Sequence, residues 1–114
     1  ALFRRLSEHS RSINAVNNLE LSHFTCRFVV LKSQEADLIS TVEAAMTRRY
    51  NPLWNSHIDG FGNHDPGKGR YEQAKSEWDV LHPGRVWADR LNGIPPDGNK
   101  VEEKIGVYHV NKST

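Results

Sequence analysis

FTCRFVVL, residues 24–31, is the stretch of this chain that most clearly indicates a β-strand. Its residues are β-branched or aromatic on both faces apart from Arg27, and such residues favour strands. A strand that is apolar on both faces is typical of the middle of a sheet, where it is covered on two sides. We therefore expect a central strand from Phe24 to Leu31.

A helical pattern precedes this strand. Residues 1–18 carry an apolar stripe at helical spacing, and His9 lies inside it. The stripe consists of Leu2, Leu6, Ile13 and Val16. Because the chain opens inside this helix without an initiator methionine, we expect it to continue an element that lies upstream.

A second helix is expected after the strand. Ser33 is suited to cap its start, and the helix runs to about Arg49. Asn51-Pro52 ends it, because proline cannot continue the hydrogen-bond ladder and disfavours helix in the preceding residue. The stripe that we expect to be buried is Ile39, Val42, Met46 and Tyr50.

The second half of the chain contains more loops. Residues 55–70 contain several glycines with His, Asn and Asp, which indicates a loop. A further helix is expected from Tyr71 to Leu81, followed by the Pro83-Gly84 turn. We expect Val101 to Val110 to be an edge strand or a dimer arm. Trp54, Trp78 and Trp87 are expected to anchor the core.

Composition excludes several classes of protein. The chain has 114 residues, a net charge of +1 and one cysteine, which leaves no internal disulfide framework and no cysteine-based zinc cluster. No apolar run is long enough for a membrane span, so we expect a cytoplasmic protein. More than half of the 15 Lys and Arg residues are arginine, which weakly favours a nucleic-acid ligand over a merely solvated basic surface.

Arg5 and His9 are the first candidate functional residues. They are four residues apart, so their side chains share one helix face. Arginine can stabilise the charge of a phosphoryl transition state, and histidine can hydrogen-bond a nucleophile. The alternative is a half-buried histidine with an arginine packed beside it.

Glu43 and Asn55 form a second candidate pair. Glu43 lies beside the apolar stripe of its helix, where a carboxylate is costly unless it is paired or binds a metal. The alternative is an ion pair with an arginine from another element. Asn55 could orient or neutralise such a site, and taken alone it is a loop asparagine.

The glycine-rich loop HDPGKGR, residues 64–70, is the third candidate. Lys68 and Arg70 beside its glycines could approach a DNA backbone closely, unless the loop is only a solvated turn. A metal site is a further alternative there, although the spacing matches no closed zinc site. Its ligands would be His57, Asp59, His64 and Asp65.

Together with RRYNPLWN (residues 48–55) and SEWDVLHPGRVWA (residues 76–88), these residues resemble the later part of a GIY-YIG superfamily nuclease. The resemblance covers about residues 1–92 and is greatest to small type II restriction endonucleases with SacII-type specificity, which cut within CCGCGG. It implies an α+β fold with a small antiparallel sheet flanked by helices.

The resemblance also implies roles for the candidate residues. Glu43 would hold Mg²⁺ or Mn²⁺, Arg5 would neutralise the charge on the phosphate, His9 would orient a tyrosine that activates water, and Asn55 would help place the phosphate. The resemblance implies a palindromic GC-rich site in double-stranded DNA as the substrate, and the symmetry of such a site implies a homodimer. It also implies that the protein acts in the bacterial cytoplasm. The expected DNA contacts are Lys68, Arg70, Arg49, His64 and Arg85.

The chain departs from the family pattern at its start. The two short strand motifs that supply tyrosines are absent, and Tyr50, Tyr71 and Tyr108 lie at other places. We therefore expect a segment upstream of Ala1 to supply the catalytic tyrosines and this chain alone to be inactive.

Residues 1–55 would be the C-terminal part of the nuclease core, 56–92 a DNA-contacting extension and 93–114 a tail. The rival function is a non-catalytic DNA-binding or assembly module.

Overall fold

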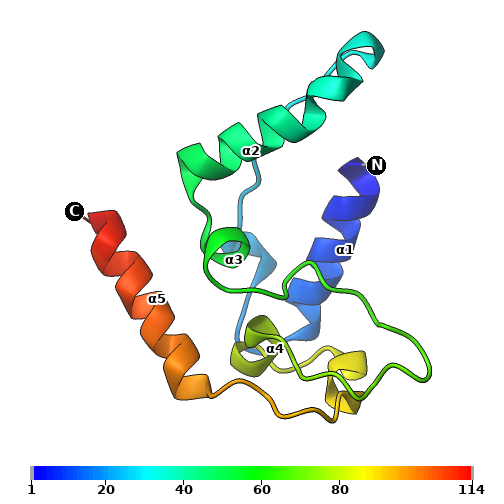
Figure 1. Ribbon diagram of the computed structural model, residues 1–114, viewed down its shortest axis with the longest axis vertical. Helices are drawn as coiled ribbons and strands as arrows, with labels where there is room; N and C mark the ends of the chain where they lie inside the picture. The colour runs from blue at the N-terminus through cyan, green and yellow to red at the C-terminus, as the bar shows by residue number, and fades with distance from the viewer. Residues whose placement is uncertain (1, 114) are drawn as a thin grey trace.

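The computed structural model describes the backbone of residues 2–113 and the side chains of residues 2–111, and within this range the chain is helical and irregular (Figure 1). The α-helices are α1 (Leu2–Ala15), α2 (Ile39–Tyr50), α3 (Leu53–Ser56), α4 (Glu77–Leu81) and α5 (Gly98–Ser113). Short 3₁₀ helices are η1 (Leu21–His23), η2 (Ser33–Leu38) and η3 (Val86–Arg90). None of the helices in this range is long and apolar enough to cross a membrane.

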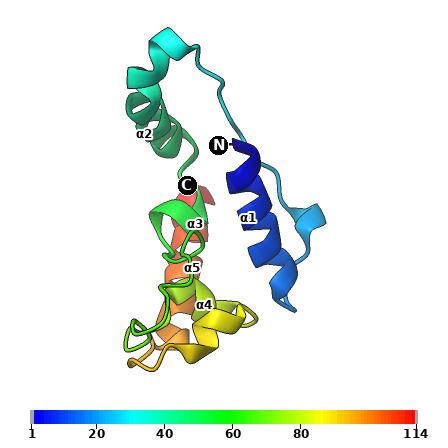
Figure 2. The same cartoon turned by 90° about the vertical axis from the view of Figure 1, so that its right-hand side faces the viewer.

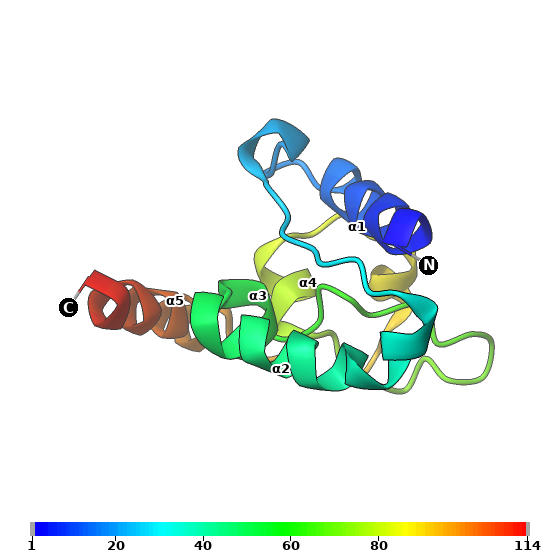
Figure 3. The same ribbon diagram turned by 90° about the horizontal axis from the view of Figure 1, so that it is seen from above.

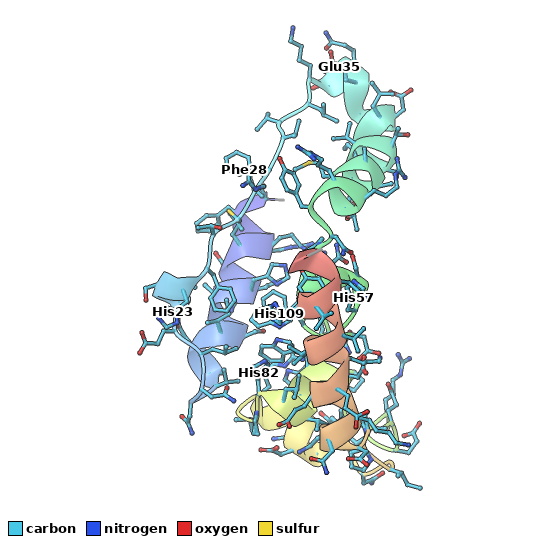
Figure 4. All side chains as sticks on the ribbon, turned by 90° about the vertical axis from the view of Figure 1, so that its left-hand side faces the viewer. His23, Phe28, Glu35, His57, His82 and His109 are labelled. Carbon is cyan, nitrogen blue, oxygen red and sulfur yellow. The ribbon has the colours of Figure 1, made fainter. Side chains whose placement is uncertain are left out.

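The expected strand from Phe24 to Leu31 is not formed, so the prediction of an α+β fold with an antiparallel sheet is wrong. Residues 2–113 contain no strand, and residues 24–31 are an extended segment that runs between α1 and α2 (Figure 3). Phe28 on this segment, labelled in Figure 4, is 56% exposed, and Val30 is 80% exposed. A strand needs the backbone groups of a neighbouring strand, and the described part of the chain offers none.

The first two helices form within the predicted ranges, but the second starts later than expected. Residues 33–38 form the 3₁₀ helix η2, and the α-helix begins at Ile39, so Ser33 does not cap it. Both helices are also less buried than expected. Ile13 and the following Val16 are buried, whereas Leu2 at the start of α1 is 42% exposed. No residue of α2 is buried, and Ile39 is 52% exposed, so the expected buried stripe of α2 is wrong. Figure 2 shows α2 extending away from the part of the molecule that contains α3 and α4.

The end of α2 is confirmed. Asn51 takes the left-handed conformation with φ 44°, and its backbone N–H donates to the Thr47 carbonyl. Asparagine tolerates this conformation better than most residues and is a common helix terminator. Pro52 follows in an extended conformation and leads into α3.

The core lies between the end of α1, α4 and α5. Its buried residues are Val16, Ile58, Trp78 and Val101, and Trp78 is completely buried. Trp54 is half-buried against this cluster and meets Trp78 edge to face at 5.6 Å. Trp78 is therefore confirmed as a core anchor.

Two elements of the second half differ from expectation. Residues 71–76 are irregular, and the helix begins only after Ser76, whose Oγ accepts a hydrogen bond from the Asp79 N–H. Val101 to Val110, expected as an edge strand or arm, belong to α5. The Tyr108 hydroxyl donates to the Asn51 carbonyl at 2.8 Å, and its ring contacts His57. The C-terminal segment is thus packed onto the end of α2.

Candidate functional site

An open pocket of about 340 Å³ lies between α1 and the loop that follows Gly60. We call it the α1 pocket. Its lining includes Arg5, His9 and Arg11 from α1, with Phe61 and His64 from the loop and Trp87 from η3. The pocket therefore brings together one predicted catalytic pair, Arg5 and His9, and two predicted DNA contacts, His64 and Arg85.

His9 is half-buried in this pocket and stacks on the Phe61 ring, with 4.5 Å between ring centroids and 21° between planes. Burial lowers the pKa of His9 below its usual 6.5. The positive charge of Arg5 and, more weakly, His64 lower this pKa further, while Glu8 opposes them. At neutral pH the imidazole is therefore uncharged and can accept a hydrogen bond or a proton.

Two arginines of the α1 pocket have no carboxylate partner. Within residues 2–111 neither Arg5 nor Arg11 forms an ion pair, whereas the neighbouring Arg4 lies 3.9 Å from Glu8. The Glu8 and Asp65 carboxylates also line the pocket, so its suitability for phosphate rests on the two exposed guanidinium groups and not on its net charge. A guanidinium can donate two hydrogen bonds to a phosphate.

Arg11 is a residue that sequence reasoning missed. It follows His9 by two positions, which does not place two side chains on the same helix face. Its long side chain nevertheless lines the pocket. Helical spacing alone gave no signal for it, since the loop that closes the pocket comes from residues about 50 positions later in the chain.

Glu43 and Asn55 lie elsewhere. Glu43 is exposed on α2, and the described residues supply no arginine partner for it. Asn55 on α3 donates from Nδ2 to the Thr47 hydroxyl at 3.4 Å. Because Thr47 follows Glu43 by one helical turn, Asn55 and Glu43 lie toward the same face of α2. Neither residue lines the α1 pocket.

A row of aromatic rings runs from His9 to Trp54, the chain neighbour of Asn55. Trp54, next to Asn55 in the chain, packs on Phe61 at 4.7 Å, and Phe61 stacks on His9. The structure thus places Arg5 and His9 at one end of this row and Asn55 at the other, in neighbouring regions rather than in one pocket.

The glycine-rich loop is internally ordered. The Asp65 carboxylate accepts hydrogen bonds from the Gly67 N–H at 3.0 Å and the Tyr71 hydroxyl at 2.8 Å. Both hydrogen bonds lower the pKa of Asp65, and the bond from Gly67 has the larger effect. Gly67 and Gly69 have φ values of 93° and 86°, which favour glycine.

This ordering leaves Lys68 and Arg70 exposed at the tip of the loop. Arg49, another expected DNA contact, is exposed in the last turn of α2. No group of three or more His, Cys, Asp and Glu side chains converges in the part of the chain that is described, so the alternative metal site in this loop is not formed.

Arg85 differs from the other expected DNA contacts because it is only 5% exposed. Its Nε donates to Asp79 at 2.7 Å, and its Nη2 donates to Asp79 at 2.9 Å and to the Gly60 carbonyl at 2.7 Å. Its Nη1 donates to the Phe61 and Asn63 carbonyls at 3.0 and 3.3 Å. Since a guanidinium has five N–H groups, none is left for DNA. In the structure Arg85 is an internal residue.

Comparison with known proteins agrees with the resemblance carried by the sequence motifs. The family model of the Eco29kI GIY-YIG domain matches residues 1–109, which is most of the chain and includes every candidate residue named above. A search of curated proteins returned no match. On the extent of the family match, this chain belongs to the Eco29kI GIY-YIG domain family, a family of restriction endonucleases.

Proposed function

We propose that this protein is a metal-dependent type II restriction endonuclease that hydrolyses phosphodiester bonds at a palindromic, GC-rich site in double-stranded DNA. The observation that carries the proposal is the α1 pocket, in which Arg5 and Arg11 have no carboxylate partner among residues 2–111 and lie beside His9, whose pKa is lowered. Family membership supports nuclease activity and DNA binding. The α1 pocket supports a phosphate site.

Arg5 and His9 have different roles in this proposal. Arg5 donates hydrogen bonds to the scissile phosphate and stabilises the negative charge that grows on it as water attacks. The His9 imidazole, uncharged at neutral pH, accepts a hydrogen bond from the group that activates water and holds it in position. In the reaction the water oxygen forms a new bond to phosphorus as the bond to the leaving oxygen breaks. The proton that the water loses passes to the activating group, and the leaving oxygen takes up a proton from solvent.

The residues around Glu43 fit a magnesium ion. The Glu43 carboxylate is exposed, and the Thr47 hydroxyl, one helical turn further along α2, accepts a hydrogen bond from Asn55 Nδ2. Mg²⁺ prefers oxygen ligands, keeps several waters and is often bound by one or two carboxylates with substrate phosphates. When bound, such an ion would stabilise charge on the leaving oxygen. Glu43 would hold it, and Asn55 would help to place the phosphate.

The expected DNA contacts extend from the α1 pocket to the glycine-rich loop. His64 lines the pocket, and Lys68 and Arg70 follow on the exposed tip of the loop. Arg49 would add a contact from the end of α2. A homodimer would present two such surfaces related by a two-fold axis, which matches the symmetry of a palindromic site.

Cleavage assays with and without metal test this function. The full-length protein is expected to cut a duplex that contains CCGCGG when Mg²⁺ is present, and excess EDTA should prevent cleavage. A duplex of the same composition with a scrambled site should remain intact. If the protein binds the cognate duplex tightly but never cuts it with Mg²⁺ or Mn²⁺, the rival function of a binding or assembly module is favoured instead.

Lys68 and Arg70 are expected to contribute differently to DNA binding. Lysine acts as a point charge on phosphate, so Lys68→Ala should weaken binding to all sequences about equally and lower the salt slope by roughly one. Arginine can donate two bonds to a guanine edge, so Arg70→Ala should cost about 1–3 kcal/mol and relax discrimination at one base pair. Salt titrations on cognate and scrambled duplexes measure both effects. Unchanged slope and specificity in both variants would make the loop a solvated turn.

A further inference from the structure

The buried ion pair of Arg85 and Asp79 lies next to the loop that closes the α1 pocket, and Arg85 contacts the backbone of this loop. Arg85 is 5% exposed and Asp79 is 3% exposed. The Asp79 carboxylate accepts two bonds from Arg85 and a third from the Ser76 hydroxyl at 2.9 Å. The guanidinium carbon lies 4.5 Å from the ring centre of Trp78 and 4.8 Å from that of Trp87. The guanidinium is therefore held by a carboxylate and two aromatic faces.

The remaining Arg85 donors bind the backbone of a single loop. They reach the carbonyls of Gly60, Phe61 and Asn63, so one side chain fixes three of four consecutive residues. Gly60 at the start of this loop has φ 106°, and a side chain there would collide with Ser76. The loop conformation thus depends on contacts with α4 and Arg85.

Phe61 connects this loop to His9. Its carbonyl accepts the hydrogen bond from Arg85, while its ring stacks on the His9 imidazole at 4.5 Å. The same ring is part of the burial that lowers the pKa of His9. Phe61 also packs on Trp54 at 4.7 Å and on Trp78 at 5.3 Å. The position of the Phe61 ring therefore depends on two kinds of contact. One is the hydrogen bond that its backbone carbonyl accepts, and the other is the aromatic packing of its side chain.

We propose that Arg85, held by Asp79, is a positioning residue that fixes the Gly60–Asn63 loop and thereby the stacking of Phe61 on His9. This inference rests on the proposed role of His9 in DNA cleavage. Arginine is needed because its planar group offers five donors in a fixed arrangement. Lysine offers three donors on one nitrogen and cannot span the Asp79 carboxylate and three carbonyls at once.

Arg85→Lys tests the proposal, with the titration of the His9 imidazole by NMR as the first readout. The loop should loosen and expose His9 to water, so the pKa of His9 should rise toward the ordinary 6.5. The groups whose charges act on the pKa of His9 are Arg5 and Glu8 on α1 and His64 on the loop. Arg11 and Asp65 also line the pocket, and this variant keeps all five groups. Lys75→Ala, which removes the exposed ion pair with Asp89, is the control and should leave the titration unchanged.

The pH profile of cleavage is the second readout. If uncharged His9 is the active form, raising its pKa should move the acid limb of kcat to higher pH by the same shift, with several-fold loss of cleavage near pH 6. KM for DNA should change little, because Arg85 has no free donor for phosphate. If the NMR titration shifts while the pH profile does not, Arg85 positions His9 as inferred, and the proposed catalytic role of His9 fails.

A second variant covers the case in which Arg85→Lys does not fold. Replacing both partners, Arg85→Met with Asp79→Leu, leaves no unpaired buried charge, and such replacements are often tolerated. The double variant should raise the pKa of His9 as Arg85→Lys does. A folded variant of either kind with an unchanged His9 titration would overturn the proposal and show that aromatic packing alone places Phe61.

Discussion

Glu43→Gln is expected to abolish DNA cleavage while leaving DNA binding at its original strength or slightly tighter. The amide keeps the shape of the side chain but lacks the charge that holds a divalent cation. Removing a negative charge close to phosphate also removes repulsion. Because Glu43 is exposed on α2, the change should alter the free energy of unfolding by no more than about 0.5 kcal/mol.

Cleavage rates and gel-shift affinities of the same variant separate the metal role from a structural one. Glu102→Gln is a matched control, since it makes the same change at an exposed position of α5. The control should cut at the wild-type rate. Cleavage retained by Glu43→Gln at saturating Mg²⁺ would remove Glu43 from the metal site, and equal loss of binding would point to a DNA contact instead.

Features that depend on neighbours in the sequence could be predicted. The α1 helix and the end of α2 at Asn51 and Pro52 follow from local spacing and from the restricted backbone of proline. The Arg5 and His9 pair follows from the same spacing, because residues four apart share a helix face. These features need no information from distant parts of the chain.

The strand expected at residues 24–31 shows where such reasoning ends. Its side chains favour a strand, but a strand forms only when another segment supplies hydrogen-bond partners. In the described residues no segment does so, and Phe28 and Val30 remain exposed. Similarly, the apolar stripe of α2 is only partly covered by the described residues: Val42 and Met46 are half-buried, while Ile39 is exposed despite its helical spacing.

Arg85 illustrates the same point for the candidate site. In the sequence it is one basic residue near a turn, and an exposed phosphate contact is a reasonable expectation. Its burial depends on Asp79 six residues earlier and on loop carbonyls 22 to 25 residues earlier. The flanking Trp78 and Trp87 were the available signal, because an arginine between tryptophans often stacks on them.

Arg5→Ala is expected to lower the cleavage rate about 10²- to 10³-fold, the usual effect of removing one electrostatic donor from a transition state. Arg5 lines the α1 pocket and has no carboxylate partner in the described part of the chain, so its charge is available to the phosphate. Its side chain is exposed, and alanine favours helix, so α1 should remain stable. The loss should therefore appear in single-turnover rates at saturating DNA and not in the unfolding curve.

Arg4→Ala provides the matched control, because it removes the same charge from the adjacent position of the same helix. Arg4 is 77% exposed, lies 3.9 Å from Glu8 and does not line the pocket. If Arg5 acts only through the overall positive charge of α1, both variants should lose DNA affinity and rate to similar extents. If Arg5 contacts the scissile phosphate, Arg4→Ala should cut at nearly the wild-type rate once DNA is saturating. Equal rates in the two variants would assign Arg5 a structural or general electrostatic role, and Arg11 would then be the remaining unpaired guanidinium in the pocket to test.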